Sequence, residues 1–270
     1  MTTTTTPAAT SADGTSIAYE PSGGGRPIVL IGGAFNDRST CAGLAGALVG
    51  TSADVAPVLI DRRGRGASGY RADHDPAREV EDVAAVIAAV GGEVDLFGHS
   101  SGAVLAIECV LAGLPVRRLA VYEPPFVVTD DRPRAIDLLG RLSALIALHR
   151  RDDAVALFLT EAALVPAEVV AGMQADAAMW GAMTALAHTL PHDSALFAPD
   201  QGIRGEERYA GIAIPVLAIA GGASPAWLQA GAARVAELVP GARHVTMPGA
   251  DHSVLHQPAD LAALMGEFLA

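Results

Sequence analysis

The stretch Val94-Asp95-Leu96-Phe97-Gly98-His99-Ser100-Ser101-Gly102-Ala103 decides the fold of this chain. A short apolar run ends at Gly98, and a segment rich in alanine, valine and leucine begins directly after Ser100. This order predicts a strand, a sharp turn and a helix. Gly98 and Gly102 flank the turn, where a β-carbon would collide with neighbouring backbone.

The turn makes Ser100 a candidate nucleophile, because it lifts the hydroxyl above the edge of the predicted sheet. A motif centred on Ser101 would need glycine in place of His99 and Ala103, so Ser100 is the serine at the centre of the motif. The backbone N–H of Ser101 falls at the helix N-terminus, where partial positive charge can stabilise an oxyanion. The alternative is a glycine-rich turn that only packs well.

Apolar runs alternate with helical stretches along both ends of the chain. We expect strands at 15–20 (an edge strand), 27–31, 55–60, 94–98, 118–122, 214–220 and 242–247, and helices near 38–49, 76–90, 101–113, 225–239 and from 258 onward. This alternation predicts an α/β fold with a mostly parallel, doubly wound sheet. Ligands of such sheets bind at the carboxyl ends of the strands, where Gly32-Gly33, Asp61, Ser100 and Glu123 fall.

The pattern changes to helices alone between residues 127 and 208. Helical stretches are expected at 134–150, 153–164 and 167–190, with a break near Gly172. This predicts a helical cap inserted into a core formed by residues 11–126 and 209–270. Met179, Trp180 and Met183 give one cap helix an apolar face that either packs as core or lines a hydrophobic pocket.

Composition excludes several function classes. The 270 residues have a formal net charge of −12, and every basic residue is an arginine. Nucleic acids, anionic membranes and polyanionic substrates are disfavoured as binding partners, because a protein binds each of them through clustered positive charge. Cys41 and Cys109 are expected to be buried free thiols, and no residues show metal-ligand spacing. The threonine-rich residues 1–10 predict a disordered tail rather than a signal peptide, and hence a cytoplasmic protein.

Four motifs resemble those of the α/β-hydrolase superfamily. They are Gly32-Gly33-Ala34, Asp61-Arg62-Arg63-Gly64-Arg65-Gly66-Ala67-Ser68, Gly98-His99-Ser100-Ser101-Gly102 and Gly249-Ala250-Asp251-His252. The resemblance implies that the N–H groups of Ala34 and Ser101 form an oxyanion hole, and that His252 is the general base. Family members commonly have histidine where this chain has Gly32. His244 and His256 are weaker candidates for the base, since one lies in a strand pattern and the other too near a helix start.

The catalytic acid departs from the family pattern. The family usually places an aspartate after the strand that follows the cap, but here that segment reads Ala220-Gly221-Gly222-Ala223-Ser224-Pro225, without a carboxylate. Glu123 follows the strand beside the Ser100 strand, and a subset of the superfamily, including some hydrolases of large mycotoxin lactones, uses a carboxylate there. We therefore expect Glu123 to be the acid. The alternatives are that Glu123 only orders the cap entrance, or that Asp251 serves instead. Asp61 and Arg63 are expected to be structural.

The resemblance implies a serine hydrolase that cleaves an ester or lactone of a small to medium apolar substrate, without a cofactor. Phe35 and Phe126, which follow the strands near the motif ends, are further candidates for lining the pocket together with the cap residues. Hydrolysis of a C–C bond, a lyase or cyclase reaction, and ligand binding without turnover remain alternatives. The natural substrate and the oligomeric state stay open.

Overall fold

The computed structural model describes residues 6–51, 53–72, 75–129 and 135–270. Across these residues one eight-stranded sheet has the order β1-β2-β4-β3-β5-β6-β7-β8. β2 pairs antiparallel with both β1 and β4, and all the other neighbours are parallel. The strands are β1 (Ala8–Thr10), β2 (Ser16–Pro21), β3 (Arg26–Ile31), β4 (Val55–Ile60), β5 (Val94–His99), β6 (Val116–Tyr122), β7 (Val216–Gly221) and β8 (Arg243–Met247). The expected mostly parallel α/β fold is confirmed.

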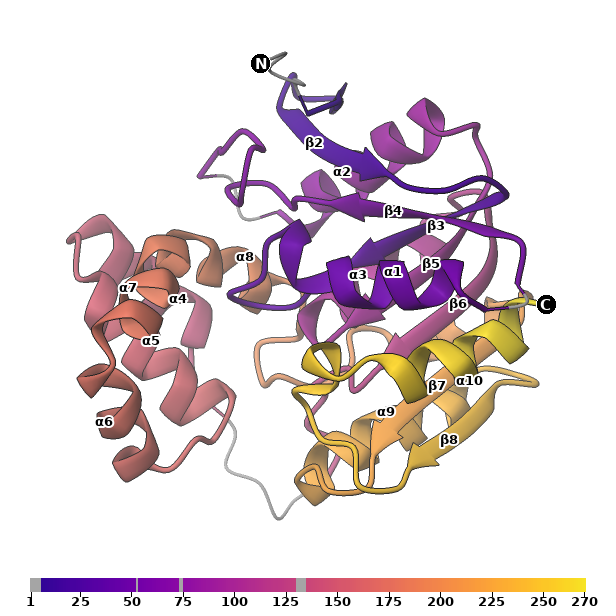
Figure 1. The fold of residues 1–270 in the computed structure, drawn as a ribbon. Helices are drawn as coiled ribbons and strands as arrows, with labels where there is room; N and C mark the ends of the chain where they lie inside the picture. The colour runs from indigo at the N-terminus through magenta and orange to yellow at the C-terminus, as the bar shows by residue number, and fades with distance from the viewer. Residues whose placement is uncertain (1–5, 52, 73–74, 130–134) are drawn as a thin grey trace.

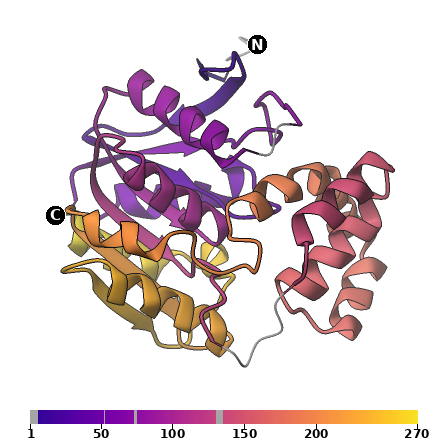
Figure 2. The same cartoon turned by 180° about the vertical axis from the view of Figure 1, so that it is seen from behind.

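Helices cover both faces of the sheet (Figures 1 and 2). One face packs against α1 (Ala42–Val49) and α10 (Ala259–Leu269), whose buried side chains include Leu44 and Leu261. The other face packs against α2 (Pro76–Ala89), α3 (Ser101–Leu111) and α9 (Ala226–Leu238). Because both faces are covered, β5 and β7 are buried at every position, and β7 is a continuous apolar run without alternation.

Between β6 and β7 the described chain forms helices that stand beside the sheet (Figure 1). They are α4 (Leu138–Ala147), α5 (Arg151–Leu157) with a π-helical turn at Phe158–Ala162, α6 (Ala167–Ala175), α7 (Ala177–Leu186) and α8 (Leu190–Ala195). They share an apolar core that includes Leu142, Val155 and Trp180. Arg134, where the first of these helices was expected to begin, lies outside the described residues.

The break in the long predicted cap helix falls at Asp176 instead of Gly172. The Asp176 carboxylate accepts hydrogen bonds from the backbone N–H groups of Ala178 and Met179, each at 3.0 Å. An aspartate in this position starts a new helix, because it satisfies N–H groups that have no partner within the helix. Gly172 is accommodated inside α6, where a β-carbon would meet no atom within 4 Å.

The N-terminal segment differs from the expected disordered tail. Ala8–Thr10 form strand β1 on the outer edge of β2, and Ala9 is buried against the core. β2 is therefore not the edge strand that the sequence predicted. Residues 1–5 of the expected tail lie outside the described residues. Within the part of the chain that the structure describes, no helix is long and apolar enough to cross a membrane.

Candidate active site

The turn between β5 and α3 holds Ser100 in a strained conformation. Its φ of 57° and ψ of −126° lie outside the regions that non-glycine residues usually adopt. Gly98 and Gly102 allow this turn. A β-carbon on Gly98 would meet backbone atoms of Gly102 and Ala103, and one on Gly102 would meet the carbonyl oxygens of Ile31 and Gly32. The two glycines thus let the turn press against its own helix and against the end of β3.

Three side chains from distant parts of the sequence meet at the carboxyl ends of β5 and β6. The Ser100 Oγ lies 3.1 Å from Nε2 of His252, and the His252 Nδ1 lies 2.7 Å from Oε2 of Glu123. The carboxylate fixes Nδ1 as the protonated nitrogen, so Nε2 faces the serine as an acceptor. The hydroxyl can therefore lose its proton to an imidazole that a carboxylate orients.

The Glu123 carboxylate is fully buried, and both of its oxygens have a partner. Oε1 accepts a hydrogen bond from the backbone N–H of Gly221 at 2.7 Å, while Oε2 faces His252. Gly221 closes β7, the strand after which the superfamily usually places its acid, and it contributes a backbone amide in place of a side chain. Asp251 points elsewhere, because its carboxylate accepts hydrogen bonds from the N–H and hydroxyl of Ser253.

Two further hydrogen bonds hold the loop that bears His252. The Tyr122 hydroxyl donates to the Asp251 carbonyl oxygen at 2.7 Å, and His99 Nε2 donates to the His252 carbonyl oxygen at 2.9 Å. Burial, together with the neighbouring His252 imidazole, lowers the pKa of His99 to about 3. His99 is therefore neutral across the physiological range and acts as a fixed donor.

The expected oxyanion hole lies where β3 and β5 leave the sheet side by side, since Ile31 pairs with Gly98. Ser101 is the first residue of α3, so its N–H lies at the positive end of the helix. Ala34 lies in the loop after β3, in which the Gly33 N–H donates to Oδ1 of Asn36 at 2.9 Å. Phe35 in this loop also has a positive φ, 59°.

An apolar cavity of about 250 Å³ opens at Ser100 and His252. Its walls come from the core and from the cap together. The lining residues are Ser100, Ser101, Pro125, Leu138, Phe158, Ala162, Ala163, Val165, Ser194, Phe197, Gln201, Pro225, Trp227, Leu228 and His252. Among the described residues of this wall there is no arginine, aspartate or glutamate. The cavity therefore favours an uncharged, apolar ligand.

The five residues predicted to line the pocket lie behind this wall or away from it. The rings of Phe35 and Phe126 pack edge-on against Phe158 and Phe197, which do line the cavity. The Trp180 side chain packs in the cap core, with its indole N–H donating to Asp152 at 2.7 Å. Met183 packs against the same apolar cluster, and Met179 is 46% exposed.

Sequence reasoning missed the contribution of α9. Trp227 and Leu228 in its first turn line the cavity, because α9 begins at the carboxyl end of β7. That position was a visible signal, since helices that follow parallel strands begin at the ligand-binding edge of the sheet.

The hydrogen bonds of Asp61 and Arg63 agree with the prediction that these two residues are structural. The Asp61 carboxylate accepts from the backbone N–H groups of Arg38 and Ala67, at 2.8 Å and 2.9 Å. Arg63 binds the Asp82 carboxylate through two hydrogen bonds of 2.7 Å. Among the described residues no cluster of three or more histidine, cysteine or acidic side chains is arranged to hold a metal.

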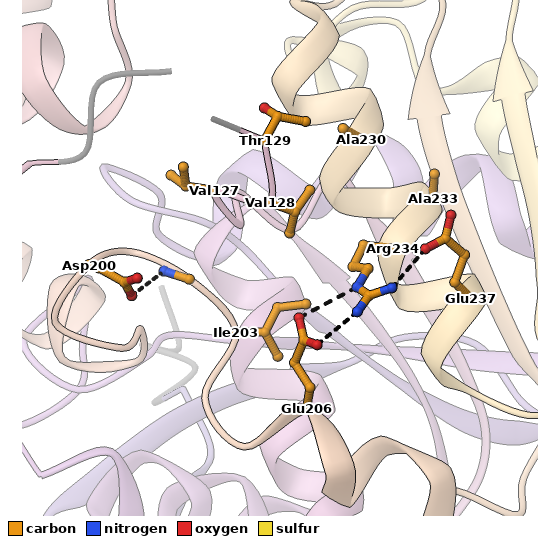
Figure 3. Close-up of a pocket in the computed structure, with 11 residues that line it drawn as sticks. Val127, Val128, Thr129, Asp200, Ile203, Glu206, Ala230, Ala233, Arg234 and Glu237 are labelled. Carbon is orange, nitrogen blue, oxygen red and sulfur yellow. Dashed lines mark hydrogen bonds and ion pairs between the residues drawn. The ribbon is translucent and has the colours of Figure 1, made fainter. Parts of the chain in front are cut away.

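A larger surface groove of about 490 Å³ lies apart from Ser100, between α9 and the segments around Val127 and Ile203 (Figure 3). Arg234 crosses it and pairs with Glu206 at 2.8 Å and with Glu237 at 3.0 Å. Its wall contains no residue of the Ser100–His252–Glu123 group, and it carries three acidic side chains against the single arginine. We therefore place the candidate site in the smaller cavity.

The comparisons with known proteins agree with this fold. A family model described as the alpha/beta hydrolase family matches residues 25–264. An alpha/beta hydrolase from Sphaerobacter thermophilus is 44% identical, with a TM-score of 0.88 over 98% of this chain and 100% of that one. No curated protein matches the chain.

Two other solved structures share the fold at low sequence identity. An esterase from Exiguobacterium antarcticum is 19% identical, with a TM-score of 0.71 over 98% of this chain and 99% of that one. An enol-lactonase from Burkholderia xenovorans is 18% identical, with a TM-score of 0.71 over 97% of this chain and 99% of that one. The family model and the Sphaerobacter relative together show that this chain belongs to the alpha/beta hydrolase family.

Proposed function

We propose that this protein is a serine hydrolase that cleaves a carboxylic ester or a lactone of a small to medium apolar substrate. The observation that supports this most directly is the chain of contacts from Ser100 through His252 to Glu123, with distances of 3.1 Å and 2.7 Å. A hydroxyl, an imidazole and a buried carboxylate in this order are the parts that nucleophilic acyl transfer needs.

In the first half of the reaction, the Ser100 Oγ attacks the substrate carbonyl and its proton passes to His252 Nε2. Negative charge develops on the carbonyl oxygen, and the N–H groups of Ala34 and Ser101 stabilise it. When the tetrahedral intermediate collapses, the C–O bond breaks and His252 gives the proton to the departing alkoxide. Glu123 stabilises the transient imidazolium and keeps its orientation.

In the second half, water attacks the acyl-enzyme while His252 accepts one of its protons. The second collapse returns that proton to Ser100 and releases the acid. For a lactone, the alcohol and the acid belong to one molecule, so the product is a single hydroxy acid. The net reaction adds one water across the ester bond and consumes no cofactor.

The cavity supports an apolar substrate of limited size. Its volume of about 250 Å³ is below the common range for drug-sized ligands, roughly 300–1,000 Å³. Phe158, Trp227 and Leu228 offer apolar surface to an acyl or alcohol chain. The esterase and the enol-lactonase named above share the fold, which is compatible with either bond.

Covalent labelling tests the nucleophile. A fluorophosphonate should label the purified protein on Ser100 and abolish hydrolysis of p-nitrophenyl butyrate, and Ser100→Ala should be neither labelled nor active. Ser194→Ala is the control, since this hydroxyl lies in the same cavity and should leave the labelling in place. Label on another residue, or an active Ser100→Ala variant, would contradict the proposal.

The reaction class needs a product measurement. In ¹⁸O-labelled water, hydrolysis places one solvent oxygen in the carboxylate product, whereas a lyase or cyclase reaction places none. Mass spectrometry of the products of an ester and lactone panel therefore separates these reactions and shows which bond is broken. A panel member that is consumed without uptake of ¹⁸O would contradict hydrolysis.

A further inference from the structure

A buried group of four charged side chains lies beneath the expected oxyanion hole. Arg62, Arg65, Glu79 and Asp193 are each no more than 3% exposed, and their formal charges cancel. Arg62 binds Glu79 through two hydrogen bonds of 2.8 Å and 2.9 Å, and it binds Asp193 at 2.8 Å. Buried charges are costly unless they are paired, and each of these four side chains faces at least one opposite charge.

Arg65 reaches the loop that bears Ala34. Its guanidinium donates to the carbonyl oxygen of Gly33 and, at 3.2 Å, to that of Asn36. The Gly33 carbonyl and the Ala34 N–H belong to the same planar trans peptide unit, in which they point in opposite directions. A cation that fixes the carbonyl therefore also fixes the direction of the N–H. The charged donor polarises the peptide as well, which strengthens the N–H as a donor.

Asp193 connects Arg65 to the other side of the hole. Both of its carboxylate oxygens accept from the Arg65 Nη2 at 2.8 Å, and Oδ1 also accepts the Ser101 hydroxyl at 2.7 Å. Ser101 is the residue that supplies the second expected N–H. One carboxylate thus joins the Ser101 side chain to the cation that holds the Gly33–Ala34 peptide.

We propose that Arg65 and Asp193 are positioning residues that hold the two N–H donors of the oxyanion hole at their working separation. Neither lines the cavity at Ser100 and His252, so both would act through the peptide units and not through contact with the substrate. The inference rests on the proposed function, because a preset pair of donors matters only where an oxyanion forms. Such donors accelerate the reaction through their fixed position, since they need no rearrangement as charge develops.

Arg63 provides a matched control in the same loop. It is also buried, but its partners are Asp82, Asp13 and the Arg78 carbonyl oxygen, away from the two N–H donors. Replacing Arg63 or Arg65 by lysine keeps the charge and removes the planar fork that binds two partners at once. Both variants should lose stability, whereas only Arg65→Lys should disturb the oxyanion hole.

The test compares hydrolysis of p-nitrophenyl butyrate with that of its thionoester, in which sulfur replaces the carbonyl oxygen. Sulfur is a weak hydrogen-bond acceptor, so the ratio of the two kcat values reports on the oxyanion hole and not on overall folding. For Arg65→Lys we expect kcat on the oxygen ester to fall by about 10–100-fold, with KM changed by less than about threefold. The ratio of kcat on the oxygen ester to kcat on the thionoester should fall by about tenfold. Arg63→Lys should keep the wild-type ratio.

A folded Arg65→Lys variant with the wild-type ratio would overturn the proposal. An equal fall in the ratio for Arg63→Lys would also overturn it, because general loosening would then be the cause. If Arg65→Lys does not fold, Ser101→Ala serves instead. This variant keeps the backbone N–H and loses the hydroxyl, which donates to Asp193 and accepts from Arg62 at 3.1 Å. An unchanged ratio would again contradict the inference. Fluorophosphonate labelling separates the two proposals: wild-type protein without label on Ser100 contradicts the hydrolase itself.

Discussion

Glu123 has a backbone conformation that glutamate rarely adopts. Its φ is 46°, in the left-handed region, and Ser100 and Phe35 at the same edge of the sheet also have positive φ values. Strain of this kind costs about 1–3 kcal/mol per residue and persists only where the surrounding structure enforces it. Here the Glu123 N–H donates to the Ile219 carbonyl oxygen at 3.0 Å, and its carboxylate is held by Gly221 and His252.

Replacing Glu123 gives the sharpest test of the proposed Ser100–His252–Glu123 triad. Glu123→Gln should lower kcat by about 10²–10⁴-fold with the fold intact, because an amide cannot stabilise the imidazolium as a carboxylate does. Asp251→Asn should cost about tenfold or less, since the Asp251 carboxylate caps Ser253 and does not face the imidazole ring. Steady-state kinetics on p-nitrophenyl butyrate, with circular dichroism to confirm folding, measures both variants.

The same two variants can contradict the assignment of Glu123 as the catalytic acid. A Glu123→Gln variant with near-normal kcat beside an inactive Asp251→Asn variant would transfer the role to Asp251. Normal activity in both would remove the need for any acid and would contradict the triad reading.

Most strands and helices could be predicted, because β3, β4 and β7 are largely apolar runs of the kind that needs burial on two faces. β4 was expected at 55–60 and spans Val55–Ile60, and β5 was expected to end in the Ser100 turn. β1 could not be predicted. Its three residues are too few to show a periodic pattern, and the strand exists because it pairs with β2 across the short turn that joins them.

The pairing of β1 in the folded protein can be tested with one variant at a buried position and one at an exposed position. Ala9→Asp should lower Tm by several degrees, because the Ala9 side chain packs into the core beside the sheet and an unpaired carboxylate there is costly. Ala8→Asp, at the neighbouring exposed position, should leave Tm nearly unchanged. Thermal unfolding of both variants decides whether this segment is a strand in solution. Equal Tm values would mean that it is not.

Part of the candidate site could be predicted from the sequence, and part of it could not. Ser100 and Glu123 were visible because each follows a strand, and strand ends of a parallel sheet meet at one edge. His252 was expected from the family resemblance, which places the general base after the last strand. The cavity wall was not visible, because it forms where separate helices dock. Trp180 illustrates the difficulty: its apolar spacing suits a pocket and a cap core equally, and only packing shows that it belongs to the cap core.

The buried His99 links the stability of the whole molecule to pH. Its pKa is about 3 in the folded protein and 6.5 when unperturbed, so the unfolded chain binds the extra proton first as pH falls. The contribution of neutral His99 is therefore complete above pH 6.5 and is lost as pH falls from 6.5 towards 3. The slope reaches about 1.4 kcal/mol per pH unit at most. The nearby His252 and His256 also oppose a charge on His99.

We therefore expect His99→Asn to flatten the decline of unfolding free energy between pH 6.5 and 4.5. Asparagine can still donate a hydrogen bond, and it does not titrate in this range. His244→Asn, at an exposed position on β8, is the control and should keep the wild-type slope. Urea unfolding at a series of pH values measures both, and identical slopes for His99→Asn and wild type would contradict the assignment.

The backbone amide of Gly221 that holds Glu123 has a consequence for how this protein can evolve. An amide N–H is present whatever side chains follow it, so the segment after β7 does not have to preserve a carboxylate for the proposed chemistry. Trp227 and Leu228, which shape the cavity, lie just beyond that segment. Substrate preference can therefore diversify by mutation between residues 222 and 228 while the reacting groups stay in place. That interval is where a library for new substrates would best be built.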